Sequence, residues 1–223
     1  MNILEINDLN KLNDRLEKEI AWRKRELSSI KENIYLTDGF KKETMLRAGV
    51  TLLYAHWEGF IKNAATFYLC YVSSLKLKYS ELTTNFLALA IKSDIDEKLI
   101  KPKKNTLHSE IINTLLQSIN EESRIPYKNK IDTRQNLNSE NFKDIMAVIN
   151  FNIDDYKLNY NLLDAKLLNM RNQIAHGEVL KAIALDESTY FEMYEKILDM
   201  MEKFKEQVFT YSFAECYKKG NNR

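Results

Sequence analysis

The residues best suited to chemistry are an arginine, an asparagine and a histidine near the end of one predicted helix. They are Arg171, Asn172 and His176. A guanidinium group can bind a phosphate through two parallel hydrogen bonds. An imidazole titrates near neutral pH and can accept or donate a proton, and an asparagine amide could orient either the imidazole or a sugar hydroxyl. Because these three side chains together could bind a phosphate and act on it, we predict a catalytic site here.

The spacing of apolar residues predicts that a helix over residues 156–176 carries this site. Its predicted core stripe consists of Leu163, Leu167, Met170 and Ile174. In a straight helix, Arg171 would lie about 80° from this stripe, whereas Asn172 and His176 would lie about 180° and 220° from it. Asn172 and His176 would then point away from the core, and Arg171 would not share a face with His176. An exposed histidine alone would be ordinary surface, but a symmetric dimer would bring two arginines and two histidines into one cleft.

A second helix, predicted over residues 41–77, has the strongest apolar pattern in the chain. Its core stripe alternates spacings of four and three residues: Leu46, Val50, Leu53, Trp57, Phe60, Ala64, Phe67 and Tyr71. A separate, largely polar strip on this helix consists of Arg47, Thr51, Ala55, Glu58 and Lys62. Glu58 and Lys62 are four residues apart in the orientation that favours an ion pair. They could be an ordinary exposed pair or could support the site, and the sequence favours neither alternative.

The composition and the remaining patterns predict an all-α fold. The 223 residues include only five Gly and two Pro, which sheet proteins need at turns. Further helices are expected over residues 6–36, around 86–91 and 111–116, from Ser139 to about 150, and over 186–218, with a loop over 123–138. We expect one domain over residues 1–223, built as a bundle of long antiparallel helices. Residues from about 80 to 155 would form shorter helices and a loop inserted before the motif helix.

The charge and the cysteine content exclude several classes of protein. The formal net charge of +1 is too small for binding nucleic acid by bulk charge alone. Two basic runs, Arg23-Lys24-Arg25 and residues 101–104, are more simply explained as a solvated helix face and a linker. Cys70 and Cys216 form no CxxC pair, which excludes a recognisable zinc site and indicates a reducing compartment. We expect no metal and no cofactor. The early acidic residues and the lack of an apolar run of about 20 residues predict a cytoplasmic protein without membrane contact.

Three segments of the chain resemble the HEPN superfamily. Its signature is Arg-x-x-x-x-His with Asn directly after the arginine, and Arg171-Asn172-Gln173-Ile174-Ala175-His176-Gly177-Glu178 fits it without a mismatch. Two further segments are similar to its stand-alone bacterial branch, called MAE-type: Tyr54-Ala55-His56-Trp57-Glu58-Gly59-Phe60-Ile61-Lys62-Asn63 and Asn136-Leu137-Asn138-Ser139-Glu140. A lone Arg-x-x-x-x-His recurs by chance in many helices. Its combination with the other two segments, over residues from about 44 to 178, is more specific.

The resemblance implies a HEPN-type helical bundle, a homodimer and a metal-independent endoribonuclease that cleaves RNA by internal transesterification. It makes Arg171 and His176 catalytic with Asn172 in support, whereas Glu58 and Lys62 follow only from the polar strip. Such proteins commonly act in toxin–antitoxin, abortive-infection or anti-phage systems, so an antitoxin or another defence partner is expected. The alternatives are a non-catalytic HEPN module that binds a nucleotide or a nucleotidyltransferase partner, and a purely structural helical adaptor. Non-catalytic members tend to lose the arginine or the histidine, and this chain has both.

Overall fold

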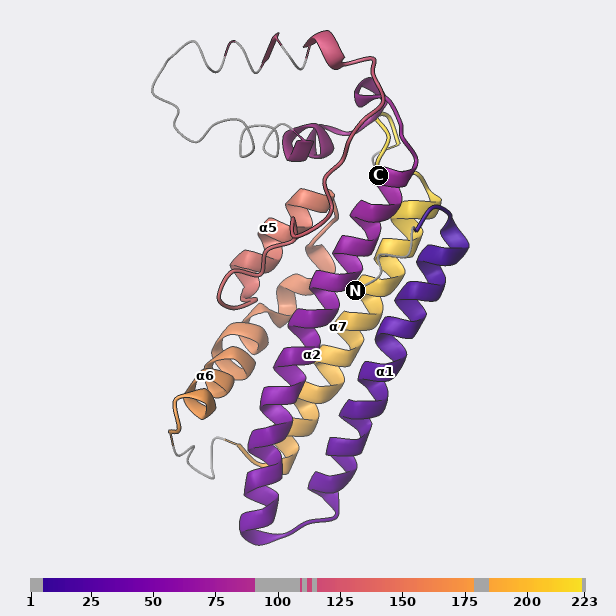
Figure 1. The fold of residues 1–223 in the computed structure, drawn as a ribbon. Helices are drawn as coiled ribbons and strands as arrows, with labels where there is room; N and C mark the ends of the chain where they lie inside the picture. The colour runs from indigo at the N-terminus through magenta and orange to yellow at the C-terminus, as the bar shows by residue number, and fades with distance from the viewer. Residues whose placement is uncertain (1–5, 91–108, 110–111, 114–115, 179–184, 222–223) are drawn as a thin grey trace.

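The computed structural model describes residues 6–90, 109, 112–113, 116–178 and 185–221. Three long helices form an elongated bundle: α1 (Leu9–Tyr35), α2 (Gly39–Ser74) and α7 (Glu187–Phe213). Helix α1 runs antiparallel to α2, and α7 runs in the same direction as α2 (Figure 1). The described residues contain no β-strand, only two isolated bridges. The predicted all-α fold is confirmed.

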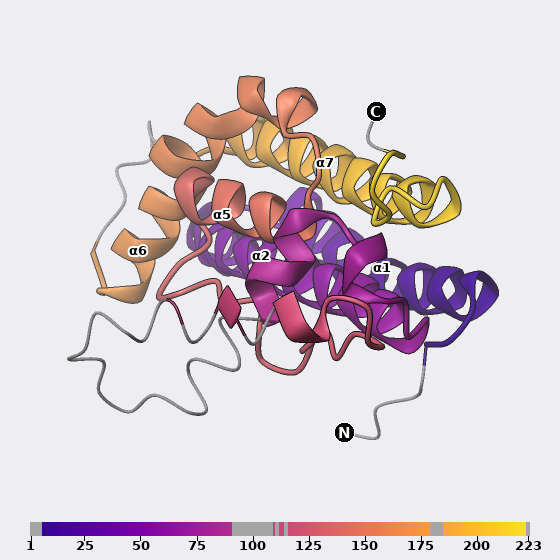
Figure 2. The ribbon, with the colours of Figure 1, turned by 90° about the horizontal axis from the view of Figure 1, so that it is seen from above.

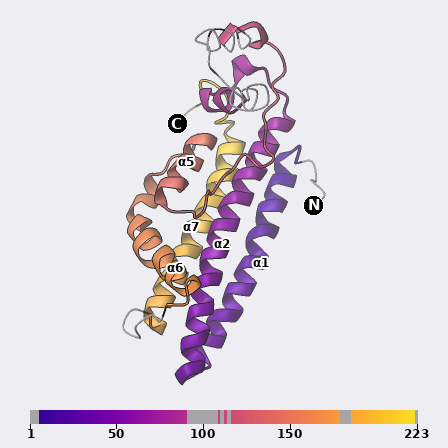
Figure 3. The same cartoon turned by 60° about the vertical axis from the view of Figure 1, so that its left-hand side comes forward.

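A second layer of shorter helical segments lies on the side of the bundle away from α1 (Figures 2 and 3). In chain order these segments are α5 (Ser139–Ile149), the 3₁₀-helix η2 (Asp154–Asn159), the π-helix η3 (Leu162–Leu168) and α6 (Asn169–Ala175). Segments α5, η3 and α6 all contact α2. The 3₁₀-helix η1 (Tyr79–Glu81) follows α2 in the chain. The second layer is therefore positioned mainly by one face of α2.

Most of the predicted boundaries of the helices and the loop are confirmed. Residues 123–138 contain no helix, and α5 begins at Ser139, although its N-cap is Asn138 rather than Ser139. The predicted helix at 86–91 is present from residue 84 to residue 90, and residue 91 lies outside the described residues. Of the predicted helix at 111–116, residues 112, 113 and 116 are described and are helical. The basic run at 101–104 lies outside the described residues.

The apolar stripe of α2 forms the centre of the core, as predicted. Its residues are buried except for Phe67, which is half-buried. Trp57 is completely buried and packs against Phe142 of α5, with ring centroids 5.4 Å apart. Phe60 packs against Phe204 of α7, with ring centroids 6.4 Å apart. Burial of this one stripe thus joins the long helices to the second layer.

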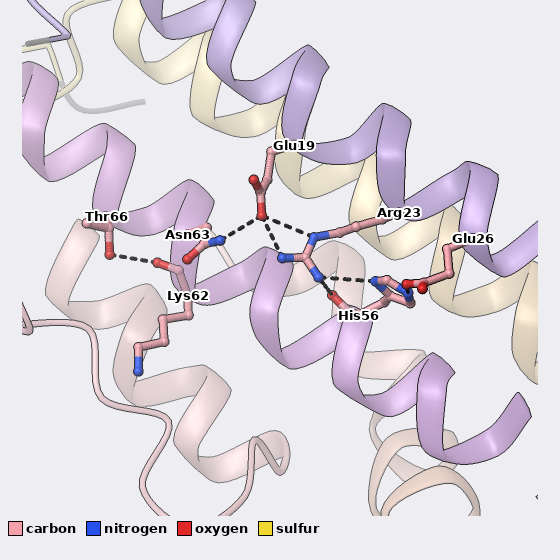
Figure 4. Close-up of polar contacts among 7 residues, drawn as sticks. All are labelled: Glu19, Arg23, Glu26, His56, Lys62, Asn63 and Thr66. Carbon is pink, nitrogen blue, oxygen red and sulfur yellow. Dashed lines mark hydrogen bonds and ion pairs between the residues drawn. The ribbon is translucent and has the colours of Figure 1, made fainter. Parts of the chain in front are cut away.

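A buried polar cluster joins α1 to α2 and corrects the expectation that Arg23 belongs to a solvated helix face. Arg23 is only 5% exposed, and its guanidinium donates to Glu19 Oε1 and to the backbone carbonyl of His56 (Figure 4). Asn63 donates to the same Glu19 oxygen at 2.6 Å. Arg23 Nη1 lies 3.2 Å from His56 Nδ1. Because a guanidinium only donates, Nδ1 accepts, and the ring proton lies on Nε2, 2.7 Å from Glu26 Oε2.

The cluster holds one full ion pair, because His56 is biased toward its neutral form. Burial, followed by the positive charge of Arg23, lowers the pKa of His56, although Glu26 opposes this shift. Gly59 makes room for the guanidinium, since a Cβ at this position would lie 3.0 Å from both terminal nitrogens of Arg23. The Arg23–Glu19 pair is therefore enclosed between the two helices.

Replacing Arg23 should destabilise the fold much more than replacing its exposed neighbour Arg25. We expect Arg23→Ala to lower the free energy of unfolding by about 3 kcal/mol, because it leaves Glu19 largely buried without its cation. Arg25→Ala removes the same charge from an exposed position and should change stability by less than about 0.5 kcal/mol. Chemical denaturation of the two variants measures the difference. Equal stabilities would show that the cluster does not hold α1 against α2.

Candidate functional site

The segment leading to the motif is not the straight α-helix that we predicted over residues 156–176. It consists of η2, then the π-helix η3, and only then α6. A π-helix has i→i+5 hydrogen bonds, so angles counted at about 100° per residue do not carry through it. Ser139 donates to both carboxylate oxygens of Asp164, from its backbone N–H at 2.8 Å and its hydroxyl at 2.5 Å, which ties η3 to the start of α5. The predicted core stripe is buried only in its first half: Leu163 and Leu167 are buried, whereas Met170 and Ile174 are half-buried.

Arg171 is half-buried on α6 and is held by two amide oxygens and one aromatic ring. Its Nη1 donates to Asn136 Oδ1 at 3.1 Å and to Asn172 Oδ1 at 2.9 Å. Its Cζ lies 5.0 Å from the centroid of the Tyr54 ring, a favourable cation–π distance. Arg171 forms no ion pair with any carboxylate of the described residues. The guanidinium is therefore oriented by its neighbours while its positive charge is not neutralised by them.

The end of α6 leaves His176 at the surface. The N–H of Gly177 donates to the carbonyl of Ile174 at 3.0 Å, and that of Glu178 donates to Gln173 at 2.9 Å. This pair of bonds is the Schellman arrangement, and Gly177 supplies the positive φ, +74°, that it requires. The imidazole of His176 is exposed and makes no hydrogen bond or ion pair with the described residues. Its exposure agrees with the prediction that it points away from the core.

The structure brings Arg171 and Asn172 together but does not join His176 to either side chain. The sequence left open whether Asn172 would orient the imidazole or a sugar hydroxyl. In the structure, Asn172 Oδ1 accepts from Arg171, and Asn172 meets His176 only through the backbone, where the N–H of His176 donates to the Asn172 carbonyl at 3.0 Å. Asn172 therefore orients the guanidinium within this chain.

The polar strip of α2 lies beside the motif, but its charged residues contact different parts of the chain. Arg47 Nη1 donates to the backbone carbonyl of Glu178 at 2.8 Å, just after the motif. Glu58 accepts from the hydroxyl of the buried Thr133 at 2.6 Å. Lys62 is exposed, and the Glu58–Lys62 ion pair, one of the two alternatives that the sequence left open, is not among the ion pairs formed by the described residues. Glu58 is therefore tied to the loop before α5, whereas the Lys62 ammonium extends away from the α1–α2 cluster (Figure 4).

Comparison with known proteins identifies the family of this chain. The sequence model of the RiboL-PSP-HEPN family matches residues 18–209, which include every residue of the candidate site. The chain belongs to this HEPN family. HEPN domains are helical, are often ribonucleases or nucleotide-binding modules, and commonly dimerise. No curated protein and no solved structure is significantly similar to the chain.

Within the described part of this HEPN chain, no helix is long and apolar enough to cross a membrane. No group of three or more His, Cys, Asp or Glu residues there could hold a metal ion.

Tyr54 and Asn136 contact the motif arginine of this HEPN chain, and sequence reasoning did not assign them to the site. Tyr54 lies outside both the predicted core stripe and the polar strip of α2, and Asn136 lies in the predicted loop. Both belong to the segments that resemble the MAE-type branch, which was the only signal that could have found them. Burial and then the nearby Glu58 carboxylate raise the pKa of Tyr54 above its usual value, so its phenol stays protonated at neutral pH.

Glu58 should contribute to stability through Thr133, and Glu58→Gln should separate this contribution from any role of its charge. Glu58→Ala leaves the buried Thr133 hydroxyl without its acceptor, so we expect a loss of about 1–2 kcal/mol in the free energy of unfolding. Glu58→Gln keeps an acceptor oxygen and should lose less than about half of that. Lys62→Ala, one turn away and exposed, should be nearly neutral. Denaturation curves measure all three, and an Ala variant as stable as the wild type would contradict the structural role.

Proposed function

We propose that this HEPN chain is a metal-independent endoribonuclease of the stand-alone MAE-type branch, with Arg171, Asn172 and His176 at its active site. The observation that supports this most is the environment of Arg171. Its guanidinium is held by neutral amide oxygens and an aromatic ring, with no carboxylate partner among the described residues. Five residues further on, the motif ends in an exposed imidazole that has no side-chain partner among the described residues. An oriented cation close in sequence to a free imidazole suits a phosphodiester substrate.

The proposed reaction is internal transesterification of RNA. His176 accepts the proton of the ribose 2′-hydroxyl, and the 2′-oxygen forms a new bond to the adjacent phosphorus. The bond from phosphorus to the 5′-oxygen breaks, and an imidazolium, the partner's His176, protonates the leaving oxygen. The products are a 2′,3′-cyclic phosphate and a free 5′-hydroxyl. Arg171 stabilises the negative charge that develops on the phosphate oxygens.

A homodimer is part of this proposal because one chain supplies only one motif histidine. The mechanism uses one imidazole as base and another as acid, and the exposed imidazole of His176 has no partner side chain among the described residues of its own chain. A twofold contact between two motif surfaces would supply the second imidazole and the second arginine. Dimerisation is common among HEPN domains, which supports this arrangement.

The remaining parts of the proposal concern the surroundings of the active site and the cellular role. Glu58 would support the site by holding the loop that carries Thr133, and the exposed Lys62 would contact the RNA backbone electrostatically. We propose that the protein acts in the cytoplasm, in a toxin–antitoxin or anti-phage system. An antitoxin or another defence protein would then restrain it until it is needed.

The mechanism predicts severe losses of activity from single substitutions in the motif. His176→Ala should reduce the cleavage rate by a factor of order 10²–10⁴, because a proton-transfer group is lost. Arg171→Ala should be similarly damaging, and Arg171→Lys should not fully restore activity, because an ammonium cannot replace the planar fork. Arg25→Ala, which removes an exposed arginine from α1, serves as the control and should keep full activity. Cleavage of labelled RNA with each purified variant measures these effects.

Substrate and chelator controls test the chemistry itself. RNA with a single 2′-deoxyribose at the cleavage position should not be cut, because the nucleophile is absent, and EDTA should leave cleavage of normal RNA unchanged. Cleavage of the deoxy substrate, or activity that EDTA abolishes and magnesium restores, would contradict the mechanism. If the wild type cut no RNA but bound a nucleotide at Arg171, the chain would be a non-catalytic HEPN module.

A mixing experiment tests whether two subunits share the active site. Light scattering at micromolar concentration should show a dimer. A mixed dimer of wild type and His176→Ala keeps only one imidazole, so it lacks either the base or the acid that the mechanism needs. An excess of His176→Ala, mixed with the wild type and allowed to exchange, should therefore lower activity below the value expected from dilution. A monomer, or activity that falls only with dilution in mixed dimers shown to have formed, would contradict the shared site.

A further inference from the structure

The loop before α5 is held on α2 next to the motif arginine. Thr133 donates to Glu58 at 2.6 Å. The backbone N–H of Leu137 donates to the Tyr54 hydroxyl at 2.7 Å, and the same Tyr54 lies under the Arg171 guanidinium. These hydrogen bonds fix a segment without helical structure at two points along α2. Between the two points lies Asn136.

Both polar atoms of the peptide bond after Asn136 are hydrogen-bonded. Its carbonyl accepts from the side chain of Asn141 at 2.7 Å, and Asn141 is itself buried. The N–H of the same peptide bond belongs to Leu137 and is bonded to Tyr54. Because a peptide group is planar, these two bonds fix its orientation. The backbone that carries the Asn136 side chain is therefore set before any ligand binds.

The Asn136 side chain uses this fixed position to hold Arg171. Its Oδ1 accepts from Arg171 Nη1, and Asn172 Oδ1 accepts from the same nitrogen. Both acceptors are uncharged amide oxygens. A carboxylate at either position would form an ion pair with the guanidinium and compete with a phosphate for it. Amide oxygens orient the guanidinium but leave its unit charge available.

We propose that Asn136 is a positioning residue that holds the Arg171 guanidinium in a fixed orientation, with its charge free for an RNA phosphate. The choice of RNA as the substrate rests on the proposed function, whereas the contact between Asn136 and Arg171 does not depend on it. Asn136 acts through Arg171 and does not itself touch the reacting atoms. Its neutrality matters as much as its hydrogen bond, and the two properties can be varied separately.

Asn136→Asp tests the neutrality, with Asn138→Asp as a matched control. Both variants replace a loop Asn by Asp and add the same charge, two positions apart. Asn138 is the N-cap of α5 and accepts from the N–H of Asn141, a role that Asp performs equally well. The probe is a single-stranded RNA with 2′-O-methyl ribose throughout, which offers phosphates but cannot be cleaved. Binding is measured across a range of salt concentrations.

Asn136→Asp should weaken binding of this probe and reduce the slope of log K against log salt by roughly 0.7, the value for one lost phosphate contact on a single strand. The slope for Asn138→Asp should stay at the wild-type value. Asn136→Ala keeps the charge of Arg171 free, so its salt slope should also be unchanged. Its cleavage rate should nevertheless fall by roughly 10- to 100-fold at nearly constant KM, because the guanidinium is no longer aligned. Equal behaviour of the two Asp variants, or full activity of Asn136→Ala, would overturn the proposal.

A measurement without RNA separates this inference from the proposed nuclease activity. In protein labelled with ¹⁵N-arginine, rotation of the Arg171 guanidinium is followed by NMR, and its signals are assigned by their loss in Arg171→Lys. Rotation should be slow in the wild type and in Asn138→Asp, and faster in Asn136→Ala. If this holds while the wild type cuts no RNA, the positioning role stands and the nuclease proposal fails. Equal rotation rates in the wild type and Asn136→Ala would overturn the positioning role whether or not the protein cuts RNA.

Discussion

Burial of the side chains of α2 sets the positions of all the other major elements, because α2 contacts α1, α7, α5 and α6. Its apolar stripe, centred on the completely buried Trp57, supplies the hydrophobic driving force of the core. Its remaining faces carry polar groups, and four of these groups form hydrogen bonds to neighbouring segments. His56 and Asn63 face α1, where they bond to Arg23 and Glu19. Tyr54 and Glu58 meet the loop before α5. One helix thus packs the core and holds the candidate site.

The two arginines that contact α2 show how the surroundings of a charge decide what it can do. Arg23 is buried and paired with a carboxylate, Glu19, so its charge is neutralised within the protein and its contribution is to stability. Arg171 is half-buried and bonded to amide oxygens. No carboxylate of the described residues pairs with it, so the guanidinium is held in a fixed orientation while its charge stays available for an anion. The same side chain therefore stabilises the fold in one place and forms a candidate phosphate site in the other.

Holding an unneutralised cation in a half-buried position costs stability, and proteins accept such costs mainly where function requires them. The hydrogen bonds around Arg171 offset part of this cost. They also remove conformational freedom that a substrate would otherwise have to remove on binding. His176 is different, because the Schellman arrangement fixes only its backbone and leaves the imidazole without a partner among the described residues. A fixed guanidinium and a free imidazole fit the proposal that the second half of the site comes from another subunit.

The sequence by itself determined the helical class, the long helices and the three motif residues as candidates. Apolar spacing near 3.6 residues depends only on neighbouring positions, so α1, α2 and α7 were predictable within a few residues. The tertiary structure alone decided the π-helix before the motif. This π-helix contains Asp164, which accepts hydrogen bonds from Ser139, 25 residues earlier in the chain. It also decided the partners of Arg171, since Asn136 lies 35 residues earlier in the chain. Such contacts depend on how distant segments pack together, and no local spacing of residue types records that.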